Sequence, residues 1–172
     1  NMGLVHIYCG DGKGKTSAAV GLAVRAAGCG KRVVIARFLK TDNSGEVEIL
    51  KKIPEVTLIP CRKTFGFVRS MDEETKRECA AYHRKLFGEA VKLAEHADLV
   101  VFDEIMAAVN YGMVPEFLEN RPGRDQTDGL EIVLTGRDPS EKLIAAADYV
   151  SEICKRKHPF DRGIMARRGV EY

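Results

Sequence analysis

Residues 3–20, GLVHIYCGDGKGKTSAAV, decide the fold of this chain. A β-rich stretch enters a glycine-rich turn, and an Ala-rich helix without proline follows. Glycines let the backbone curl so that successive N–H groups point at phosphate oxygens, and the helix adds the positive end of its dipole. This order of strand, loop and helix is typical of a P-loop. The predicted nucleotide-binding residues are Gly10, Asp11, Gly12, Lys13, Gly14, Lys15, Thr16 and Ser17.

Two side chains of this loop carry predicted chemistry. Lys15 supplies a cation for the phosphates and is a candidate catalytic residue, because it would stabilise the charge of a leaving phosphate group. The Thr16 hydroxyl is a predicted Mg²⁺ ligand. The general pattern G-x-x-x-x-G-K-[ST] has glycine where this chain has Cys9, so the match is incomplete. The alternative is a glycine-rich turn that binds no ligand.

The stretch LVVFDE at 99–104 supplies the expected second half of a nucleotide site. An apolar strand that ends in Asp103 and Glu104 would place carboxylates beside the phosphates, where Mg²⁺ bridges protein and triphosphate. The predicted metal ligands are therefore Thr16, Asp103 and Glu104. Glu104 could instead polarise a water molecule, as a hydrolase would require, and the residues do not decide between these roles.

The rest of the chain alternates between strand and helix signals. Strands are predicted at 3–9, 32–39, 56–59, 99–103, 130–135 and 149–154, and helices at 15–27, 72–97 and 141–147. Such alternation indicates βαβ units and an α/β fold of three layers. We predict a P-loop, RecA-like fold whose mostly parallel sheet has about 5–6 strands and carries helices on both faces. Ligands of such folds bind at the carboxyl ends of the strands.

Composition limits the classes of protein that fit. The 172 residues suit one domain, predicted to span 2–172, since Asn1 precedes Met2 and is interpreted as a cloning remnant. A net charge of +2 is too balanced for a dedicated nucleic-acid binder, and the basic stretch at 155–158 suits a small polyanion equally well. No apolar run approaches the roughly 18 residues of a membrane span. We predict a cytoplasmic protein without membrane or nucleic-acid partners.

The five cysteines are odd in number and widely separated, with no C-x-x-C pair. Neither a zinc site nor a redox dithiol is supported by this spacing. We expect reduced, mostly buried thiols.

Four motifs together resemble one family. They are GDGKGKTSAA at 10–19, VVFDEI at 100–105, LTGR at 134–137 and KHPFDRGIMARRGVEY at 157–172. In their order and spacing they are similar to the P-loop-type corrinoid adenosyltransferases, the ATP:cob(I)alamin adenosyltransferase family. That family's loop resembles GNGKGKTT and also lacks the leading glycine, which accounts for Cys9. The closing run is the most family-specific motif.

The resemblance implies a reaction. The family transfers the 5′-deoxyadenosyl group of ATP to the cobalt of a reduced Co(I) corrinoid and releases triphosphate, in adenosylcobalamin synthesis or salvage. Co(I) is itself a strong nucleophile, so no Ser-His-Asp or Cys-His set is required, and none is evident. The family is thought to hold ATP across the loop in reverse, with C5′ facing the acceptor. Family likeness also suggests a homodimer and a flavoprotein electron donor.

Aromatic side chains before the long helix occupy the lower face of the corrinoid in this family, with a pattern like G-F-x-W. The chain has Gly66-Phe67-Val68-Arg69 at this place and no Trp. We hypothesise that Phe67 is the catalytic wedge that displaces the lower axial ligand, with Phe65 or Arg69 as a possible assistant. The alternative is that Phe65 and Phe67 are ordinary core residues.

Other assignments are weaker. Arg137 follows a predicted strand and is a candidate nucleotide ligand. His158 either contacts substrate or orders the turn with Pro159. Lys40 and Asp42 are placed on the corrinoid side of the site. His6, His83 and His96 are interpreted as structural.

Two further functions compete with adenosyl transfer. A RecA-like P-loop ATPase or regulatory switch would use the same loop, and so would a kinase for a small metabolite, although no acceptor-side base is identifiable.

Overall fold

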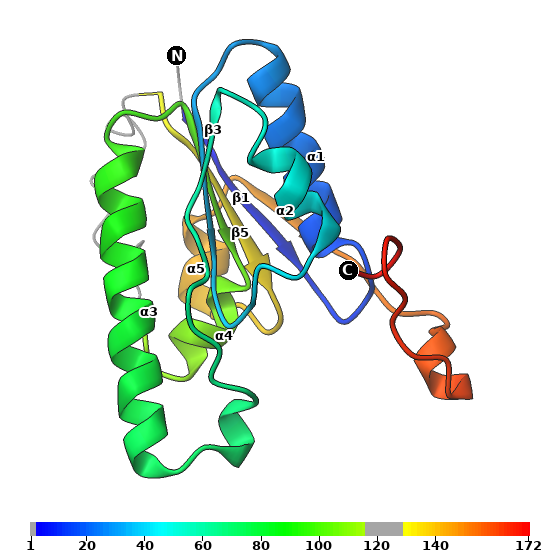
Figure 1. The fold of residues 1–172 in the computed structure, drawn as a ribbon. Coiled ribbons are helices and arrows are strands. Elements are labelled where there is room, and N and C mark those ends of the chain that lie inside the picture. Colours follow the sequence, from blue (N-terminus) through cyan, green and yellow to red (C-terminus); the bar gives the residue numbers. More distant parts are fainter. Residues whose placement is uncertain (1–2, 116–128) are drawn as a thin grey trace.

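The computed structural model describes residues 3–115 and 129–172. Six strands form one sheet, and every pairing in this part of the chain is parallel. The spatial order is β3-β2-β4-β5-β1-β6 (Figure 1). Their bounds are β1 Val5–Cys9, β2 Val33–Arg37, β3 Val56–Leu58, β4 Leu99–Asp103, β5 Glu131–Gly136 and β6 Tyr149–Glu152. The phosphate loop follows β1, and β5 lies between β1 and the carboxylate-bearing strand β4.

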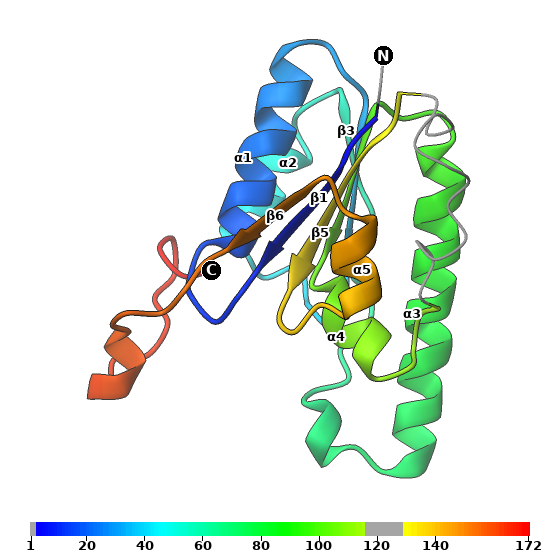
Figure 2. The ribbon, with the colours of Figure 1, turned by 180° about the vertical axis from the view of Figure 1, so that it is seen from behind.

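Helices cover both faces of the sheet, as Figures 1 and 2 show from opposite sides. One face carries α1 and α2, and the other carries α3, α4 and α5. Their bounds are α1 Lys15–Gly28, α2 Gly45–Leu50, α3 Glu73–Ala94, α4 Ile105–Asn110 and α5 Glu141–Ala146. The predicted three-layer α/β fold is therefore confirmed.

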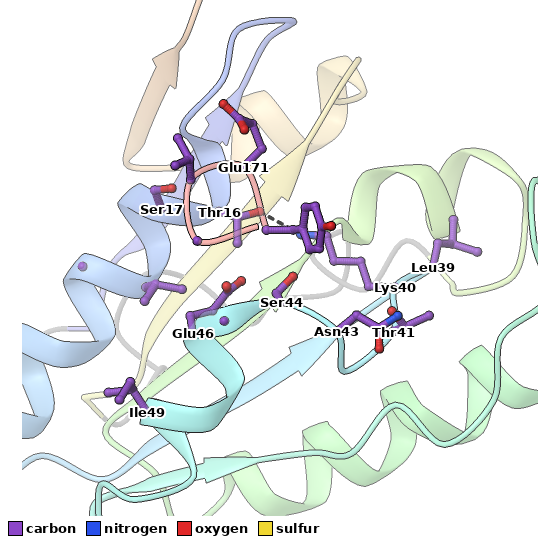
Figure 3. A pocket seen from close by; sticks show the side chains of 16 residues that line it. Thr16, Ser17, Leu39, Lys40, Thr41, Asn43, Ser44, Glu46, Ile49 and Glu171 are labelled. Carbon is purple, nitrogen blue, oxygen red and sulfur yellow. Dashed lines mark hydrogen bonds between the residues drawn. The ribbon is translucent and has the colours of Figure 1, made fainter. Parts of the chain in front are cut away.

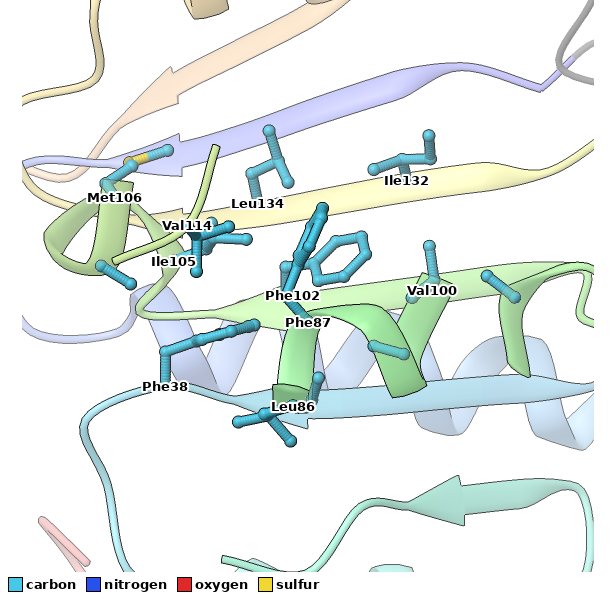
Figure 4. Close-up of a cluster of buried hydrophobic side chains, with 14 of the residues drawn as sticks. Phe38, Leu86, Phe87, Val100, Phe102, Ile105, Met106, Val114, Ile132 and Leu134 are labelled. Atoms are coloured by element: carbon cyan, nitrogen blue, oxygen red, sulfur yellow. The ribbon is translucent and has the colours of Figure 1, made fainter. Parts of the chain in front are cut away.

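The two faces differ in the side chains that they bury. Beneath α1 the sheet meets small alanines, Ala19 and Ala23, so the helix that carries the phosphate loop lies close to the strands. Beneath α3 to α5 the core is aromatic, and Phe38, Phe87 and Phe102 pack together (Figure 4). This arrangement follows the apolar stripe of α3, whose buried positions are Cys79, His83, Leu86, Phe87, Ala90 and Ala94.

Backbone strain is concentrated at the carboxyl ends of the strands. The non-glycine residues with positive φ in the described ranges are Leu39, Glu104 and Asp138, with φ values of 53°, 58° and 53°. They follow β2, β4 and β5 respectively. Non-glycine residues in this region cost on the order of 1–3 kcal/mol and persist where the surrounding structure fixes them, often at functional sites. Three strained turns thus lie at the carboxyl ends of the strands.

Some details differ from the sequence-based expectations. Helix α2 and the short 3₁₀ turns at Val68–Ser70 and Pro159–Arg162 were not predicted. The 3₁₀ turns, of three and four residues, are too short to show a helical periodicity, whereas α5, which is as short as α2, was predicted. The expectation of mostly buried thiols is wrong for Cys29 and Cys154, which are exposed. No helix among the described residues is both long and apolar enough to span a membrane. Asn1 and Met2 lie outside the described residues.

Candidate active site

The loop after β1 adopts a curled backbone that only glycine allows. Gly10 and Gly14 have φ values of 109° and 122°. A Cβ on Gly10 would lie 2.3 Å from the carbonyl oxygen of Ile153, and a Cβ on Gly12 would lie 2.8 Å from the same atom. Gly10 is therefore required both by its dihedral angle and by the close approach of a second backbone segment, whereas Gly12 is required by the close approach and Gly14 by its dihedral angle.

That second segment is the chain after β6. The amide of Gly12 donates to the carbonyl of Ile153 (2.8 Å), and the amide of Ile153 donates to the carbonyl of Cys9 (2.8 Å). The Asp11 carboxylate accepts a hydrogen bond from the amide of Lys155 (2.8 Å), and this bond lowers the pKa of Asp11. The side chain of Asp11 thus braces the loop, and Asp11 also lines the hollow predicted to hold phosphates.

Lys15 and Thr16 begin α1 at the mouth of the loop. The Lys15 ammonium is buried and donates to the carbonyl of Gly12 (2.9 Å), so its side chain folds back over the loop. The Thr16 hydroxyl donates to Asp103 at the end of β4, at 3.0 Å from Oδ1. Strand β4 and helix α1 therefore bring together two predicted metal ligands, Thr16 and Asp103, that lie far apart in sequence.

Asp103 is almost completely buried, with 2% of its side chain exposed. Besides Thr16, the Thr135 hydroxyl donates to its Oδ1 (2.6 Å), and the Lys40 ammonium donates to its Oδ2 (2.5 Å). Thr135 in turn accepts from the amide of Glu104 (2.9 Å), which fixes the strained turn after β4. Neither Lys40 nor Thr135 was predicted as a neighbour of this carboxylate, because residue types alone do not reveal which strand ends meet.

A hollow of about 300 Å³ lies over the phosphate loop. Every predicted loop residue from Asp11 to Ser17 lines it, and so do Glu104, Arg137 and His158. Gly10 and Asp103 are not among its lining residues. Three cationic side chains, Lys13, Lys15 and Arg137, therefore face one small space, which suits a polyphosphate.

A wider cleft of about 940 Å³ adjoins this hollow (Figure 3). The N-terminal part of α1, the turn after β2, the start of α2 and the C-terminal residues 169–172 line it. Thr16, Ser17 and Glu171 line both spaces. Glu171 accepts hydrogen bonds from the Arg167 side chain, which lower its pKa to about 2 and so keep it a carboxylate. Glu171 belongs to the closing motif at 157–172 but was not predicted as a site residue, and no sequence pattern indicated the α2 residues.

A third hollow, of about 210 Å³, continues from the cleft to the loop before α3. Leu39, Lys40 and Thr41 line both spaces, and Phe65 and Phe67 line the far side. Phe65 packs against the core, with its ring 5.6 Å from that of Tyr82. Phe67 is 86% exposed. The alternative that Phe67 is an ordinary core residue is therefore wrong.

The turn after β2 is held by a buried histidine. His83 Nδ1 donates to the carbonyl of Cys79 (2.8 Å), so its Nε2 is free to accept a hydrogen bond from the amide of Leu39 (2.9 Å). Nε2 can accept this bond only when the ring is neutral, and burial lowers the pKa of His83. The structural interpretation of His83 is confirmed, and its contact fixes the strained turn that carries Lys40.

The remaining weak assignments are placed as follows. Asp42 forms an ion pair with the buried guanidinium of Arg37 and accepts from the amide of Cys61, so its carboxylate is used to build the turn. His158 accepts from the amide of Phe160 (3.1 Å), which orders the turn at Pro159, and it also lines the phosphate-loop hollow. Arg69 lies away from Phe67's hollow, beside Lys76 and Tyr111.

The parallel sheet, the curled glycine loop and the buried carboxylate at the end of β4 define a P-loop nucleotide-binding protein. A family model described as ATP:corrinoid adenosyltransferase BtuR/CobO/CobP matches residues 1–172. The chain belongs to this family.

Individual relatives agree with this assignment. A corrinoid adenosyltransferase of Escherichia coli (strain K12) is 33% identical over 178 residues, which cover 99% of this chain and 86% of the relative. Corrinoid adenosyltransferase CobA of Salmonella typhimurium is 34% identical over 176 residues, with coverages of 99% and 86%. A corrinoid adenosyltransferase of Pseudomonas aeruginosa is 30% identical over 178 residues, with coverages of 99% and 84%.

Gly10→Ala should unfold the phosphate loop. The new Cβ would meet the Ile153 carbonyl at a backbone angle that only glycine tolerates, so we expect a loss of about 2–5 kcal/mol in the free energy of unfolding, measured in urea. Gly88→Ala, in the middle of α3 with open space around it, is the matched control and should gain about 0.5–1 kcal/mol. Equal stabilities for the two variants would contradict the loop geometry.

Because His83 is bound as a neutral ring, we expect the free energy of unfolding to depend on pH. Because its pKa is lowered in the folded state, the unfolded chain binds the proton first as the pH falls. The contribution of the neutral ring is complete above about pH 6.5 and is lost progressively below it. His83→Gln retains an acceptor for the Leu39 amide but cannot titrate. Urea unfolding between pH 5 and 8 should show a shallower decline for this variant, and an unchanged decline would refute the assignment.

Proposed function

We propose that this protein transfers the 5′-deoxyadenosyl group of ATP to the cobalt of a Co(I) corrinoid and releases triphosphate. The observation that supports the proposal is that three adjoining hollows, which share lining residues, form a continuous path from the phosphate loop to an exposed aromatic loop. A triphosphate in the cationic hollow leaves the adenosine portion in the cleft. C5′ then faces the space bordered by Phe67, where a flat, largely apolar corrinoid would be received.

The reaction needs positioning and charge stabilisation rather than a protein nucleophile. Two electrons of Co(I) form the Co–C bond while the bond between C5′ and its oxygen breaks, and those electrons leave with triphosphate. Lys13, Lys15 and the loop amides stabilise the charge that develops on the leaving group. Holding C5′ close to cobalt can contribute up to about 7–11 kcal/mol in favourable cases. Arg137 lines the same hollow and is proposed as a further phosphate ligand.

The residues at the end of β4 fit Mg²⁺. The Thr16 hydroxyl and the Asp103 carboxylate are oxygen donors within 3.0 Å of each other, and Glu104 lines the adjoining hollow. Mg²⁺ is usually bound by one or two carboxylates together with substrate phosphates, which matches this sparse set. When bound, Mg²⁺ would neutralise part of the triphosphate charge. The protein groups proposed to hold it are Thr16, Asp103 and Glu104.

Phe67 is proposed as the wedge beneath the corrinoid. Gly66, just before the ring, has a φ of 74°, a conformation that glycine adopts without strain. Phe67 is 86% exposed, so its ring is available to pack against the face of a corrinoid. Phe65 supports the loop from the core side.

The alternative of a RecA-like ATPase switch has no observation in its favour, since the named relatives are adenosyltransferases. A homodimer, a flavoprotein electron donor and a cytoplasmic location remain predictions.

The function is tested by incubating the protein with ATP, Mg²⁺ and chemically reduced cobalamin or cobinamide. We expect a photolabile Co–C product and inorganic triphosphate. Lys15→Ala should lower the rate by about 100-fold or more, because it removes a preorganised cation from the leaving group. Formation of ADP and phosphate in place of these products would contradict the proposal.

The Phe67→Ala variant tests the proposed wedge role of Phe67 without changing the rest of the site. The side chain is exposed, so stability in urea should change by no more than about 0.5 kcal/mol. Adenosylation of chemically generated Co(I) should be retained, whereas turnover that starts from Co(II) with a weak reductant should fall by about tenfold or more. Tyr111→Ala, which removes an exposed aromatic outside this loop, is the control. Equal turnover from Co(II) in the parent and Phe67→Ala would rule out the wedge.

A further inference from the structure

The Lys40 ammonium contacts side-chain oxygens of Thr16 and Asp103, two of the residues proposed to hold a metal. This ammonium donates to Oδ2 of Asp103 (2.5 Å), and Thr16 itself donates to the same carboxylate. The ammonium also donates to Oγ1 of Thr16 (2.8 Å), a contact that Figure 3 shows. A cation that shares a P-loop hydroxyl and the carboxylate of the central strand has the coordination expected of Mg²⁺. The lysine thus supplies one positive charge at the metal position.

The buried carboxylate requires that charge. Asp103 is 2% exposed, and its other side-chain partners, Thr16 and Thr135, are neutral hydroxyls. Within residues 3–115 and 129–172, Lys40 is the one basic side chain that forms an ion pair with Asp103. A buried carboxylate without a cationic partner is strongly destabilised, because hydroxyls replace only part of its lost hydration.

The backbone that carries Lys40 is held by contacts that do not involve the Asp103 carboxylate, although the amide of Phe38 donates to the Asp103 backbone carbonyl (2.9 Å). The amide of the strained residue Leu39 is bound by His83, and the carbonyl of Thr41 accepts from Arg37 (3.2 Å). Arg37 also pairs with Asp42. Since the residues on both sides of Lys40 are anchored, its side chain can leave Asp103 without rearranging the turn.

Open space beside Asp103 can accommodate the Lys40 side chain when it leaves the carboxylate. Its side chain is 27% exposed and lines both the wide cleft and the hollow that ends at Phe67. Both spaces adjoin the region in which the proposed function places the nucleotide. An ammonium displaced from Asp103 would therefore remain within the substrate-binding region, near the phosphates.

We propose that Lys40 is a tethered counter-ion of Asp103, which neutralises the carboxylate until Mg²⁺–ATP binds and then swings into the cleft. The inference rests on the Mg²⁺–ATP site of the proposed function but not on transfer to cobalt. It has two consequences. Lys40 stabilises the protein in the absence of metal, and it competes with Mg²⁺ for Thr16 and Asp103. A role that only supports the fold would give the first consequence without the second.

The test measures the melting temperature Tm of the parent and Lys40→Met in EDTA, in increasing Mg²⁺, and in Mg²⁺ with ATP, without any corrinoid. In EDTA we expect Lys40→Met to melt about 5–10 °C below the parent, because Asp103 is left unpaired. Increasing Mg²⁺ should close this gap. Half-saturation should require about tenfold less Mg²⁺ than in the parent, because the competing cation is gone.

Lys76→Met is the matched control, since Lys76 forms an exposed ion pair with Glu73 at 3.4 Å and should not alter the response to Mg²⁺. A Lys40→Met deficit that is equal in EDTA and in saturating Mg²⁺ would overturn the proposal, and so would an unchanged or higher Mg²⁺ requirement. If Lys40→Met does not fold, Asp103→Asn and the double variant Lys40→Met/Asp103→Asn are compared in EDTA. If the two variants have equal Tm values, Lys40 stabilises the protein only through Asp103, as the proposal requires. A lower Tm of the double variant contradicts the proposal.

Because no corrinoid is present, failure of this test is distinguishable from failure of the proposed adenosyl transfer. A protein that does not alkylate cobalt could still show the Mg²⁺-dependent rescue, and an active enzyme could lack it.

Discussion

A carboxylate buried at the end of the central strand must be neutralised, and much of the catalytic edge is built around Asp103 for that reason. Four segments meet at its oxygens: the start of α1 through Thr16, the turn after β2 through Lys40, the end of β5 through Thr135, and β4 itself. Each contact is weak when the charge is exposed to water, but burial makes every partner significant. The same charge that organises the strands is the one that a divalent metal would use.

The phosphate loop depends on a different constraint, namely the approach of a second backbone. The chain after β6 lies against Gly10 and Gly12 so closely that no side chain fits, and hydrogen bonds join the two segments. Residues 167–172 then fold back so that Glu171 lines the phosphate-loop hollow. The C-terminal motif therefore lines the hollow over the phosphate loop, although it is more than 130 residues from the loop in sequence.

The exposed aromatic loop indicates which kind of acceptor the site can accommodate. A P-loop by itself would serve a kinase, an ATPase or a transferase. Here the spaces next to the triphosphate lead through the Lys40 turn to Phe67, an apolar side chain held in the open. This geometry suits an acceptor with a large flat face, which agrees with the family to which the chain belongs.

Local sequence patterns were sufficient to predict the fold class, the loop glycines and the proximity of Thr16 and Asp103 as ligands of one magnesium site. These features depend on local patterns: strand and helix periodicities, backbone dihedral requirements, and the rule that parallel strands present their carboxyl ends at one edge. Even Lys40 could be assigned to that edge, but on the corrinoid side.

Only the tertiary structure decided which strand ends meet. The order β3-β2-β4-β5-β1-β6 brings Lys40 and Thr135 to Asp103, and a residue's type does not encode its neighbour in the sheet. The roles of Asp42 and His83 in holding the β2 turn, and the exposure of Phe67 beside a packed Phe65, were decided in the same way. Long-range packing determines burial and partners, and burial determines whether a charge or a ring supports the fold or meets a substrate.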